Sequence, residues 1–354
     1  MTMFLTIAVI VLIYVVIFQI AKASEYVSVL KGEETSRRQN NKINGFLMVA
    51  FLVLGMIGVW YCNKIYLPKT LLAVPSASVE GARVDSMLWI TIGVTGIVFI
   101  ATQAVLFWFA YKYQDSDRKV FYFPHNNKLE VLWTIVPAIV LTVLVVIGLR
   151  NWFLFTGEPK QGAMVVEVTG KQFSWIFRYP GKDAAFGKKY FKNIDDAANN
   201  LLGIIWDDQL SHDDVVTDKL VLVKGKPVKL IIGSRDVIHD VGLSHFRMKM
   251  DAVPGIPTTM WFTPAYTTKE MKEITKNPNF VYEISCDQMC GNNHFSMRGI
   301  IEVIDQEEYD VWMAKQKPTY LLTHPDLDPE NKKADSTKLA TKPADTTAKP
   351  VAKL

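Results

Sequence analysis

Two cysteines, a histidine and a methionine lie within a single stretch of twelve residues near the C-terminal end of the chain. From Cys286 to Met297 the sequence spaces these donors as C-x3-C-x3-H-x2-M, with His294 as the imidazole. A second imidazole, His239, lies upstream at the end of a run that we predict to be a strand. Thiolate, thioether and imidazole groups are soft ligands, and together they favour copper. A structural zinc site would favour C-x2-C pairs and rarely uses methionine.

The second cysteine, Cys290, changes which kind of copper site the spacing predicts. One cysteine, two histidines and an axial methionine are typical of a blue-copper site. Two thiolates can instead bridge a compact pair of copper ions, with one histidine and one weaker ligand on each ion. Such a filled site has no open position for a substrate, so the pattern predicts electron transfer. A cysteine-nucleophile site is disfavoured, because both cysteines stand beside a metal-ligand histidine and not beside a separate base.

The composition narrows the class of protein. Of the 354 residues, 49% are apolar and 21% are charged, and the mean hydropathy is +0.13. These values argue against a disordered chain and against a purely soluble one. The net charge of +4 is too weak for a nucleic-acid partner. The three cysteines exclude a disulfide-rich fold, and the sequence has no C-x-x-C-H motif for attached c-type haem.

Four charge-free windows in the first 150 residues are long enough to cross a bilayer. They cover residues 1–21, 43–63, 86–111 and 131–149. The first window lacks a basic leader and a clear cleavage site, so we favour a retained helix over a signal peptide. The segments 22–42 and 112–128 carry five and four Lys or Arg residues, against three in 64–85. The positive-inside rule then predicts that the N-terminus and everything after Arg150 lie outside, in the periplasm of a bacterial inner membrane.

Short alternating apolar runs follow the fourth window and predict an all-β domain of the Greek-key kind. The segment 181–218 interrupts this pattern like an insertion, and we predict a short helix near 197–205 within it. Residues 305–317 predict one amphipathic helix. Beyond about 325 the chain has almost no large apolar side chains and is predicted to be disordered. The predicted strands include Val166–Val168, an aromatic run at Phe173, Trp175, Phe177 and Tyr179, then Leu220–Val223, Val228–Ile232, Thr259–Phe262, Phe280–Ser285 and Gly299–Ile304.

With these motifs in place, the chain resembles subunit II of haem-copper cytochrome c oxidases over about residues 85–320. That family carries a binuclear copper centre (CuA) on a cupredoxin domain, with the motif C-x-E-x-C-x3-H-x2-M. Its D-V-x-H, D-A-x-P-G and L-E-x-x-W-T motifs match Asp236–His239, Asp251–Gly255 and Leu129–Thr134. The resemblance implies a membrane-anchored protein with four N-terminal helices and a cupredoxin-like domain. It divides the chain into an extra hairpin (1–65), the family's hairpin (85–150), the copper domain (151–325) and a basic tail (326–354).

The resemblance also implies ligands, partners and a proton path. A cytochrome c would deliver electrons to the copper pair, which would pass them to haem a in subunit I, where oxygen is reduced. The donor would be a soluble cytochrome c or a haem subunit of a partner such as alternative complex III in a supercomplex. Glu130 matches a residue at the mouth of a proton pathway, although an ordinary solvated carboxylate at a helix end explains it too. The implied copper ligands are His239, Cys286, the backbone carbonyl of Gln288, Cys290, His294 and Met297.

Three departures from the family pattern affect function. Gln288 replaces a glutamate whose carboxylate binds magnesium at the subunit I interface, so a magnesium ion is in doubt. Phe173 replaces the tryptophan through which electrons usually arrive, so either Phe173 or Trp175 receives them. The first two membrane helices are extra and are expected to pack against other subunits. We also expect Asp236, Asp240 and Asp287 to form an acidic docking surface for a lysine-rich donor.

Other families were weighed against this one. A quinol oxidase subunit II shares the fold but lacks the copper ligands. A nitrous oxide reductase shares the copper motif but needs a large propeller domain, for which the chain has no room. A membrane-anchored copper chaperone or a structural metal-binding module is a different class of protein. A chaperone needs an exposed, exchangeable site, whereas this ligand set predicts a closed one.

Overall fold

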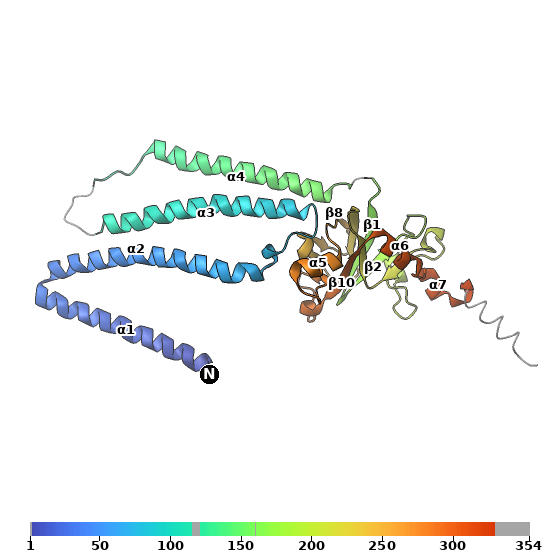
Figure 1. Cartoon of the computed structure of the whole chain (residues 1–354), viewed down its shortest axis with the longest axis horizontal. Coiled ribbons are helices and arrows are strands. Elements are labelled where there is room, and N and C mark those ends of the chain that lie inside the picture. Colours follow the sequence, from blue (N-terminus) through green and yellow to red (C-terminus); the bar gives the residue numbers. More distant parts are fainter. Residues whose placement is uncertain (1, 115–120, 160, 330–354) are drawn as a thin grey trace, which may run out of the picture. The chain divides into compact units, whose positions relative to one another are not determined.

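A computed structural model describes residues 2–114, 121–159 and 161–329, and Figure 1 labels its elements. The chain forms two compact units, which we describe separately. The helical unit comprises Met1–Ala73 and Leu88–Val145, and the β unit comprises Val74–Met87 and Val146–Leu354. The α-helices are α1 (Thr2–Lys31), α2 (Glu33–Tyr66), α3 (Gly81–Lys112), α4 (Asn127–Thr156), α5 (Thr268–Thr275), α6 (Gln306–Ala314) and α7 (Thr319–Thr323). The 3-10 turns are η1 (Leu67–Lys69), η2 (Leu71–Ala73), η3 (Phe191–Asn193), η4 (Gln209–Ser211), η5 (Ser244–Phe246), η6 (His294–Ser296) and η7 (Pro325–Leu327).

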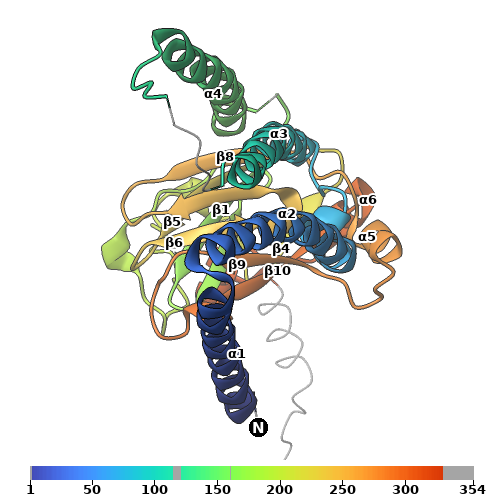
Figure 2. The same cartoon turned by 90° about the vertical axis from the view of Figure 1, so that its left-hand side faces the viewer.

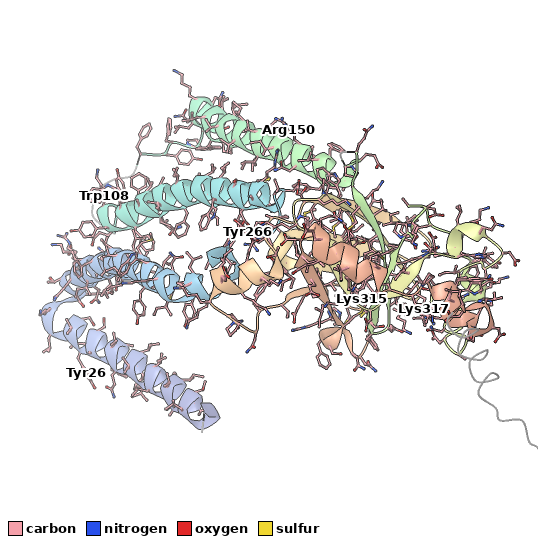
Figure 3. All side chains as sticks on the ribbon, turned by 45° about the vertical axis from the view of Figure 1, so that its right-hand side comes forward. Tyr26, Trp108, Arg150, Tyr266, Lys315 and Lys317 are labelled. Atoms are coloured by element: carbon pink, nitrogen blue, oxygen red, sulfur yellow. The ribbon has the colours of Figure 1, made fainter. Side chains whose placement is uncertain are left out.

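Helices α1 to α4 confirm the four predicted spans, because each is long and apolar enough to cross a membrane. At most 6% of the apolar window of any of them is buried within the protein. Their side chains project on all sides, as Figure 3 shows for Tyr26 and Trp108. Such helices are stable in lipid because every backbone hydrogen bond is made within the helix. The segment 22–42, treated as a loop in the sequence, is helical except at Gly32, whose positive φ of 83° separates α1 from α2.

The β unit holds ten strands in two five-stranded sheets, which confirms the predicted all-β domain. The strand orders are β3-β2-β1-β5-β8 and β4-β10-β9-β6-β7, and Figure 2 gives a second view of them. Pairs β1–β5 and β4–β10 are parallel, and the other pairs are antiparallel. The strands are β1 (Met164–Lys171), β2 (Ser174–Tyr179), β3 (Val215–Thr217), β4 (Leu220–Val223), β5 (Val228–Ser234), β6 (His239–Leu243), β7 (Met248–Ala252), β8 (Thr258–Phe262), β9 (Tyr282–Cys286) and β10 (Arg298–Ile304).

One hydrophobic core fills the space between the two sheets. Both sheets contribute fully buried residues at alternating positions, such as Leu230 and Ile232 on β5 and Ile284 on β9. Alternation places these residues on one face of each strand, where the two sheets pack together. The copper-ligand candidates Cys286 and Met297 belong to the same core cluster, so the packing of the sandwich also holds the site.

Residues 74–87, which include the first turns of α3, belong to the β unit. The amide of Val79 donates to the carbonyl of Thr263 at 3.0 Å, and the buried carboxylate of Glu80 accepts from the Thr263 amide at 2.7 Å. The guanidinium of Arg247 lies 2.8 Å from the carboxylate of Asp85 in the first turns of α3. These bonds hold the beginning of α3 to the β unit.

The insertion at residues 181–218 differs from its prediction. The short helix expected near 197–205 is wrong, because this stretch forms turns. The side chain of Asn200 accepts from the amide of Ile204 and donates to its carbonyl, and Gly203 has a positive φ of 66°. Short polar side chains that bond the local backbone compete with helix formation in this way.

Two further elements correct or complete the sequence analysis. His239 begins strand β6, whereas we expected it at the end of a strand; four residues, 235–238, separate it from β5. Helix α5 was not predicted, although Thr267 and Glu270 form a reciprocal capping box at its start. Helix α6 confirms the helix predicted at 305–317. Most of the predicted tail, 330–354, lies outside the described residues.

Candidate metal centre

Two neighbouring strands and one loop position the candidate ligands. His239 is the first residue of β6, and Cys286 is the last residue of the adjacent β9. The pairing of Val241 with Cys286 sets these two strand ends side by side. The chain then runs through a loop that carries Cys290 and the turn η6 before it enters β10. This loop folds back because the amide of Cys286 donates to the carbonyl of Met297 at 3.1 Å.

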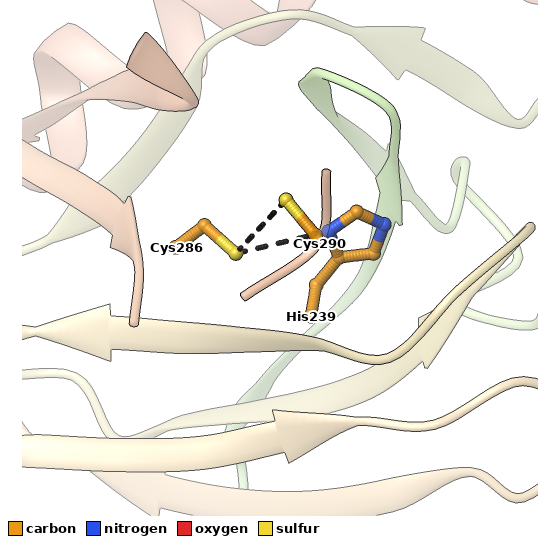
Figure 4. Close-up of side chains that lie close together, drawn as sticks. All are labelled: His239, Cys286 and Cys290. Atoms are coloured by element: carbon orange, nitrogen blue, oxygen red, sulfur yellow. Dashed lines mark hydrogen bonds between the residues drawn. The ribbon is translucent and has the colours of Figure 1, made fainter. Parts of the chain in front are cut away.

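The six predicted ligands converge on one point. The Sγ atoms of Cys286 and Cys290 are 3.7 Å apart, and one ligand atom each from His239, Cys286 and Cys290 lie within 4.8 Å of one another (Figure 4). Each sulfur has an imidazole of its own. Nδ1 of His239 is 3.7 Å from Sγ of Cys286, and Nδ1 of His294 is 3.6 Å from Sγ of Cys290.

Each sulfur also has one weaker donor nearby. The carbonyl oxygen of Gln288 lies 3.2 Å from Sγ of Cys286, and Sδ of Met297 lies 3.8 Å from Sγ of Cys290. The site is therefore two matching halves that share a pair of sulfurs. This donor set fits a pair of soft metal ions, with two thiolates between them and one imidazole on each side.

The site is enclosed, and the burial affects its thiols. His239, Cys286, Cys290 and Met297 are all buried, and His294 is half-buried. Burial, followed by the contact with Cys286, raises the pKa of the Cys290 thiol to about 11. Two buried thiolates this close repel each other, so bound cations are needed to hold both in the ionised form.

A carboxylate behind His239 fixes the orientation of that ring. Oδ1 of Asp236 lies 2.8 Å from Nε2 of His239, and Oδ2 accepts from the amide of Gln172 at 2.8 Å. Burial acts to raise the pKa of Asp236, but the bonds from Gln172 and His239 lower it below its usual value. The ionised carboxylate favours the tautomer with a proton on Nε2, which leaves Nδ1 free to bind metal.

Sequence reasoning missed the groups that make room for this site. The side chain of Gln172 donates to the carbonyl of Cys290 at 2.5 Å and so ties the ligand loop to the β1–β2 turn. A Cβ on Gly170 would lie 2.8 Å from Cδ2 of His239, so only glycine lets the ring pack against β1. A Cβ on Gly291 would lie 2.9 Å from the side-chain Nε2 of Gln172 and 3.0 Å from the Phe173 ring. The glycines were visible in the sequence, but their close contacts depend on the fold.

The two aromatic candidates for electron uptake, Phe173 and Trp175, differ in exposure and in what they contact. Trp175 is only 3% exposed, and its ring packs edge-on against His239 with the centroids 6.1 Å apart. Phe173 is half-buried and lies over Gly291, next to Cys290 in the ligand loop. A donor protein can therefore touch Phe173 more readily than Trp175.

The Glu130 carboxylate and the Gln288 side chain are not among the candidate copper ligands. Glu130 is exposed in the first turn of α4 and belongs to the helical unit. Gln288 is exposed and offers a neutral side-chain amide. Hard cations such as Mg²⁺ prefer carboxylate ligands, so residue 288 does not fit the magnesium site that the family implies.

The predicted acidic docking surface needs a correction. Asp236 and Asp287 are exposed, but Asp240 is only 1% exposed and cannot meet a donor. Asp240 points from β6 to the outer face of its sheet. Burial, followed by the neighbouring Asp251, raises its pKa to about 7. The surface around the ligand loop is instead partly apolar, with Met289 and Phe295 each about three-quarters exposed, at 76% and 77%.

Comparison with known proteins matches both parts of the chain to one family. The family model "Cytochrome C oxidase subunit II, periplasmic domain" matches residues 164–304, and the corresponding transmembrane domain matches residues 72–150. The chain is 33% identical over 237 residues to the alternative cytochrome c oxidase subunit 2 of Bradyrhizobium diazoefficiens, which covers 66% of this chain and 80% of that protein. This chain belongs to the cytochrome c oxidase subunit II family.

Other members of the family are more distant. Cytochrome c oxidase subunit 2 of Cereibacter sphaeroides is 25% identical over 252 residues, which cover 69% of this chain and 79% of that one. The solved periplasmic domain of subunit II of cytochrome oxidase from Bradyrhizobium japonicum is 24% identical, with a TM-score of 0.31, and the match covers 46% of this chain and 98% of that domain.

Membership of the subunit II family confirms several sequence predictions. The protein is a membrane-anchored subunit of a cytochrome c oxidase, which is a haem-copper terminal oxidase. Its domain after α4 has the cupredoxin-like fold of that family. The matched transmembrane range, 72–150, contains all of α3 and the part of α4 up to residue 150. Helices α1 and α2 lie outside both matched ranges. The family implies a copper centre, and the cluster of two cysteines and a histidine is where this chain would hold it.

Proposed function

We propose that this chain is the electron-input subunit of its oxidase and holds a binuclear copper centre. The observation that carries the proposal is the matched geometry of the two sulfurs, 3.7 Å apart, each with one Nδ1 within 3.7 Å. When bound, the copper pair supplies one-electron chemistry. The sulfurs of Cys286 and Cys290, the imidazoles of His239 and His294, and the weaker donors Gln288 and Met297 would hold it.

The enclosure of the site supports electron transfer over substrate chemistry. Burial of His239, Cys290 and Met297 excludes water and leaves no approach for a substrate molecule. The same burial argues against a copper chaperone, which has to pass its metal to another protein. The strands and the hydrogen bonds of Asp236 and Gln172 hold the ligands in place, which keeps reorganisation during electron transfer small.

We assign electron uptake from the donor to Phe173. It is the aromatic residue of the pair that reaches the surface, and it packs on the ligand loop at Gly291. Trp175 then serves to orient His239 from inside the sandwich. Phe173→Ala should slow copper reduction by the donor without changing the copper spectrum, and Trp175→Phe should perturb the spectrum more than the donor reaction. The opposite pattern would exchange the two roles.

The partners and topology follow from the same proposal. Subunit I accepts electrons at haem a, and a cytochrome c, either soluble or part of a partner complex, delivers them. The chain lies in a bacterial inner membrane, with the segment 22–42 inside and the β unit in the periplasm. Reporter fusions test this topology: one within 22–42 should read cytoplasmic, and one after Arg150 should read external. The salt dependence of donor oxidation tests the docking mode, and a flat profile would rule out docking through Asp287 and Asp236.

We also propose that Glu130 lies at the entrance of a proton pathway into subunit I. Its place in the first turn of α4, before a charge-free span, supports uptake from the cytoplasmic side. Glu130→Gln keeps the shape and removes the exchangeable charge. Oxygen consumption should fall while copper reduction by the donor stays normal. Unchanged oxygen consumption would make Glu130 an ordinary helix-end carboxylate.

Copper content and electron paramagnetic resonance test the central proposal. The oxidised full chain should contain two copper ions and show one unpaired electron shared over both nuclei. Cys290→Ser should abolish that spectrum, because a hydroxyl is a poor bridge, whereas Met297→Leu should keep both ions and shift the potential. Cys62→Ser on α2 is the matched control, because Cys62 is exposed and lies in the other unit. An unaltered spectrum in Cys290→Ser would refute the assignment.

A further inference from the structure

The loop that carries Cys290 has little secondary structure to hold it. Strand β9 ends at Cys286, the turn η6 begins at His294, and the residues between them belong to neither element. Cys290 is the one buried residue of the stretch 287–293, and its neighbours on both sides are exposed. The sheet pairing that fixes Cys286 therefore does not extend to Cys290.

A single side chain provides the hydrogen bond that holds this segment. Nε2 of Gln172 donates to the carbonyl of Cys290 at 2.5 Å. Apart from the contact between the Gln288 carbonyl and Sγ of Cys286, this is the one hydrogen bond that another part of the described chain makes to the backbone of residues 288–290. Removing the donor of Gln172 therefore removes the hydrogen bond that fixes the main chain at Cys290.

The same residue contacts the other half of the site through its main chain. The amide of Gln172 donates to Oδ2 of Asp236 at 2.8 Å, and Oδ1 of Asp236 lies 2.8 Å from Nε2 of His239. The amide of Arg235 also donates to the carbonyl of Gly170 at 2.9 Å, which holds the same two segments together. The His239 half thus has two ties to the β1–β2 hairpin that do not depend on the side chain of Gln172, whereas the other half depends on that side chain.

We propose that Gln172 is a positioning residue whose side chain fixes the half of the metal centre that contains Cys290 and His294. This role rests on the binuclear copper centre proposed above. The amide of His294 donates to the carbonyl of Gly291 at 3.1 Å, so a shift of the main chain at Cys290 moves the imidazole as well. Hydrogen bonds to groups that carry metal ligands orient those ligands and change how tightly the metal is held.

The position of Gln172 also keeps the assigned electron entrance in contact with the ligand loop. Phe173 is the next residue in the chain, and both side chains lie directly against Gly291. Gly291 has a positive φ of 135°, a conformation that a residue with a side chain rarely adopts. The bond from Gln172 to the Cys290 carbonyl therefore holds the loop against Phe173, through which we assign electron uptake.

Spectroscopy of the copper-loaded full chain tests which half the side chain holds. Gln172→Met keeps the length of the side chain and removes the donor. Electron–nuclear double resonance should show a changed nitrogen coupling for one imidazole and a wild-type coupling for the other. Asp236→Asn, which removes the carboxylate bound to His239, should change the opposite coupling. Ser174→Ala is the matched control, because it removes one hydroxyl at the beginning of β2 on the same hairpin, and it should change neither. Equal changes in both couplings in Gln172→Met, or no change in either, would overturn the proposal.

Thiol alkylation of the copper-free full chain tests the same bond without any metal. We would treat the reduced, detergent-solubilised protein with iodoacetamide and follow each cysteine by mass spectrometry. Cys290 should react about fivefold faster in Gln172→Met than in the wild type, as expected for the loss of one hydrogen bond that holds a buried group. Cys286, at the end of β9, should react at the wild-type rate.

The two experiments separate this role from the copper assignment. An unchanged rate at Cys290 in Gln172→Met, or an equal acceleration at Cys286, would show that the side chain does not hold the Cys290 half. A wild-type chain that binds no copper pair would refute the proposed function, and the alkylation rates would still decide whether Gln172 positions Cys290.

Discussion

The β unit buries carboxylates in two places, and their negative charge is balanced differently in each. At the first, the guanidinium of Arg178 is fully buried between Glu167, at 3.0 Å, and Asp214, and it also donates to the carbonyl of Gly187 at 2.6 Å. At the second, Asp240 is almost fully buried beside two other aspartates, and its nearest cation is a largely exposed lysine.

The difference indicates two different roles for buried charge. Burial raises the pKa of Asp214, and Arg178 acts against that rise. Arg178 on β2 contacts Glu167 on β1 and Gly187 and Asp214 of the insertion. The charges of this Arg178 cluster are therefore balanced within the chain. Asp240 has more negative than positive charge around it among the residues described, and burial, followed by Asp251, raises its pKa to about 7.

The largest expected effect is the loss of Arg178. Arg178→Met leaves Asp214 buried without its cation, whereas Glu167 keeps its ion pair with Lys189 at 2.9 Å. Removing one partner of a buried ion pair costs about 3–5 kcal/mol. We expect the free energy of unfolding of the β unit to fall by that amount, measured by urea titration with tryptophan fluorescence. Arg298→Met, in an exposed pair with Glu283, is the control and should change stability by less than about 0.5 kcal/mol. Equal effects of the two substitutions would mean that burial does not distinguish them.

The second effect should have the opposite sign. Asp240→Asn removes a buried charge that has no hydrogen-bond donor among the described residues, so it should stabilise the β unit by about 1–3 kcal/mol. Urea titration of both proteins measures the difference. A destabilised Asp240→Asn protein would show that Lys249 already compensates the charge.

The candidate copper ligands, the membrane spans and Asp240 show what the sequence could and could not predict. The clustering of the candidate copper ligands was predictable, because five donor side chains lie in two short motifs; the Gln288 carbonyl was implied only by the family resemblance. The four spans were predictable because each is one long charge-free window. Asp240 was wrongly placed on a docking surface, because alternation along β6 tells which face it occupies but not what covers that face.

The errors elsewhere have a similar origin in tertiary contacts. The insertion was expected to contain a helix near 197–205, but side-chain bonds of Asn200 to the backbone favour turns there. Arg178 lies in an aromatic strand and gave no signal, because its two carboxylate partners are 11 and 36 residues away in sequence. Helix α5 could have been predicted from Thr267 and Glu270, whose spacing matches a capping box.

A third prediction concerns the close contact at Gly242. Gly242→Ala places a methyl group against the Asp287 carboxylate, which is exposed and can swing away at little cost. The free energy of unfolding, measured by urea titration, should therefore fall by less than about 1 kcal/mol. Gly233→Ala is the control, because a Cβ there meets nothing within 4 Å. A loss as large as that of Arg178→Met would show that the Asp287 side chain cannot move aside.

The smallest effect should come from an ion pair that resembles the Arg178 cluster in chemistry but lies in solvent. Arg235 makes two bonds to the carboxylate of Asp196, at 2.7 and 2.8 Å, and the Asp196 side chain is 54% exposed. The hydrogen bond from Arg235 is the main cause that lowers the pKa of Asp196 to about 2. An exposed pair gains little because water and salt screen it. Asp196→Asn should therefore lower the melting temperature less than any other substitution that breaks an ion pair here.

The pH dependence of that small effect has a definite sign. A carboxylate with a lowered pKa in the folded protein contributes stability above its ordinary value of 3.8, and the contribution disappears as the pH falls from about 4 to about 2. The difference in melting temperature between the wild type and Asp196→Asn should thus be constant near neutral pH and shrink below pH 4. Asp207→Asn removes another exposed carboxylate of the same insertion and is the control for the loss of one surface charge. If Asp196→Asn destabilised the β unit as much as Arg178→Met does, the two-bond geometry of an ion pair would matter more than its burial.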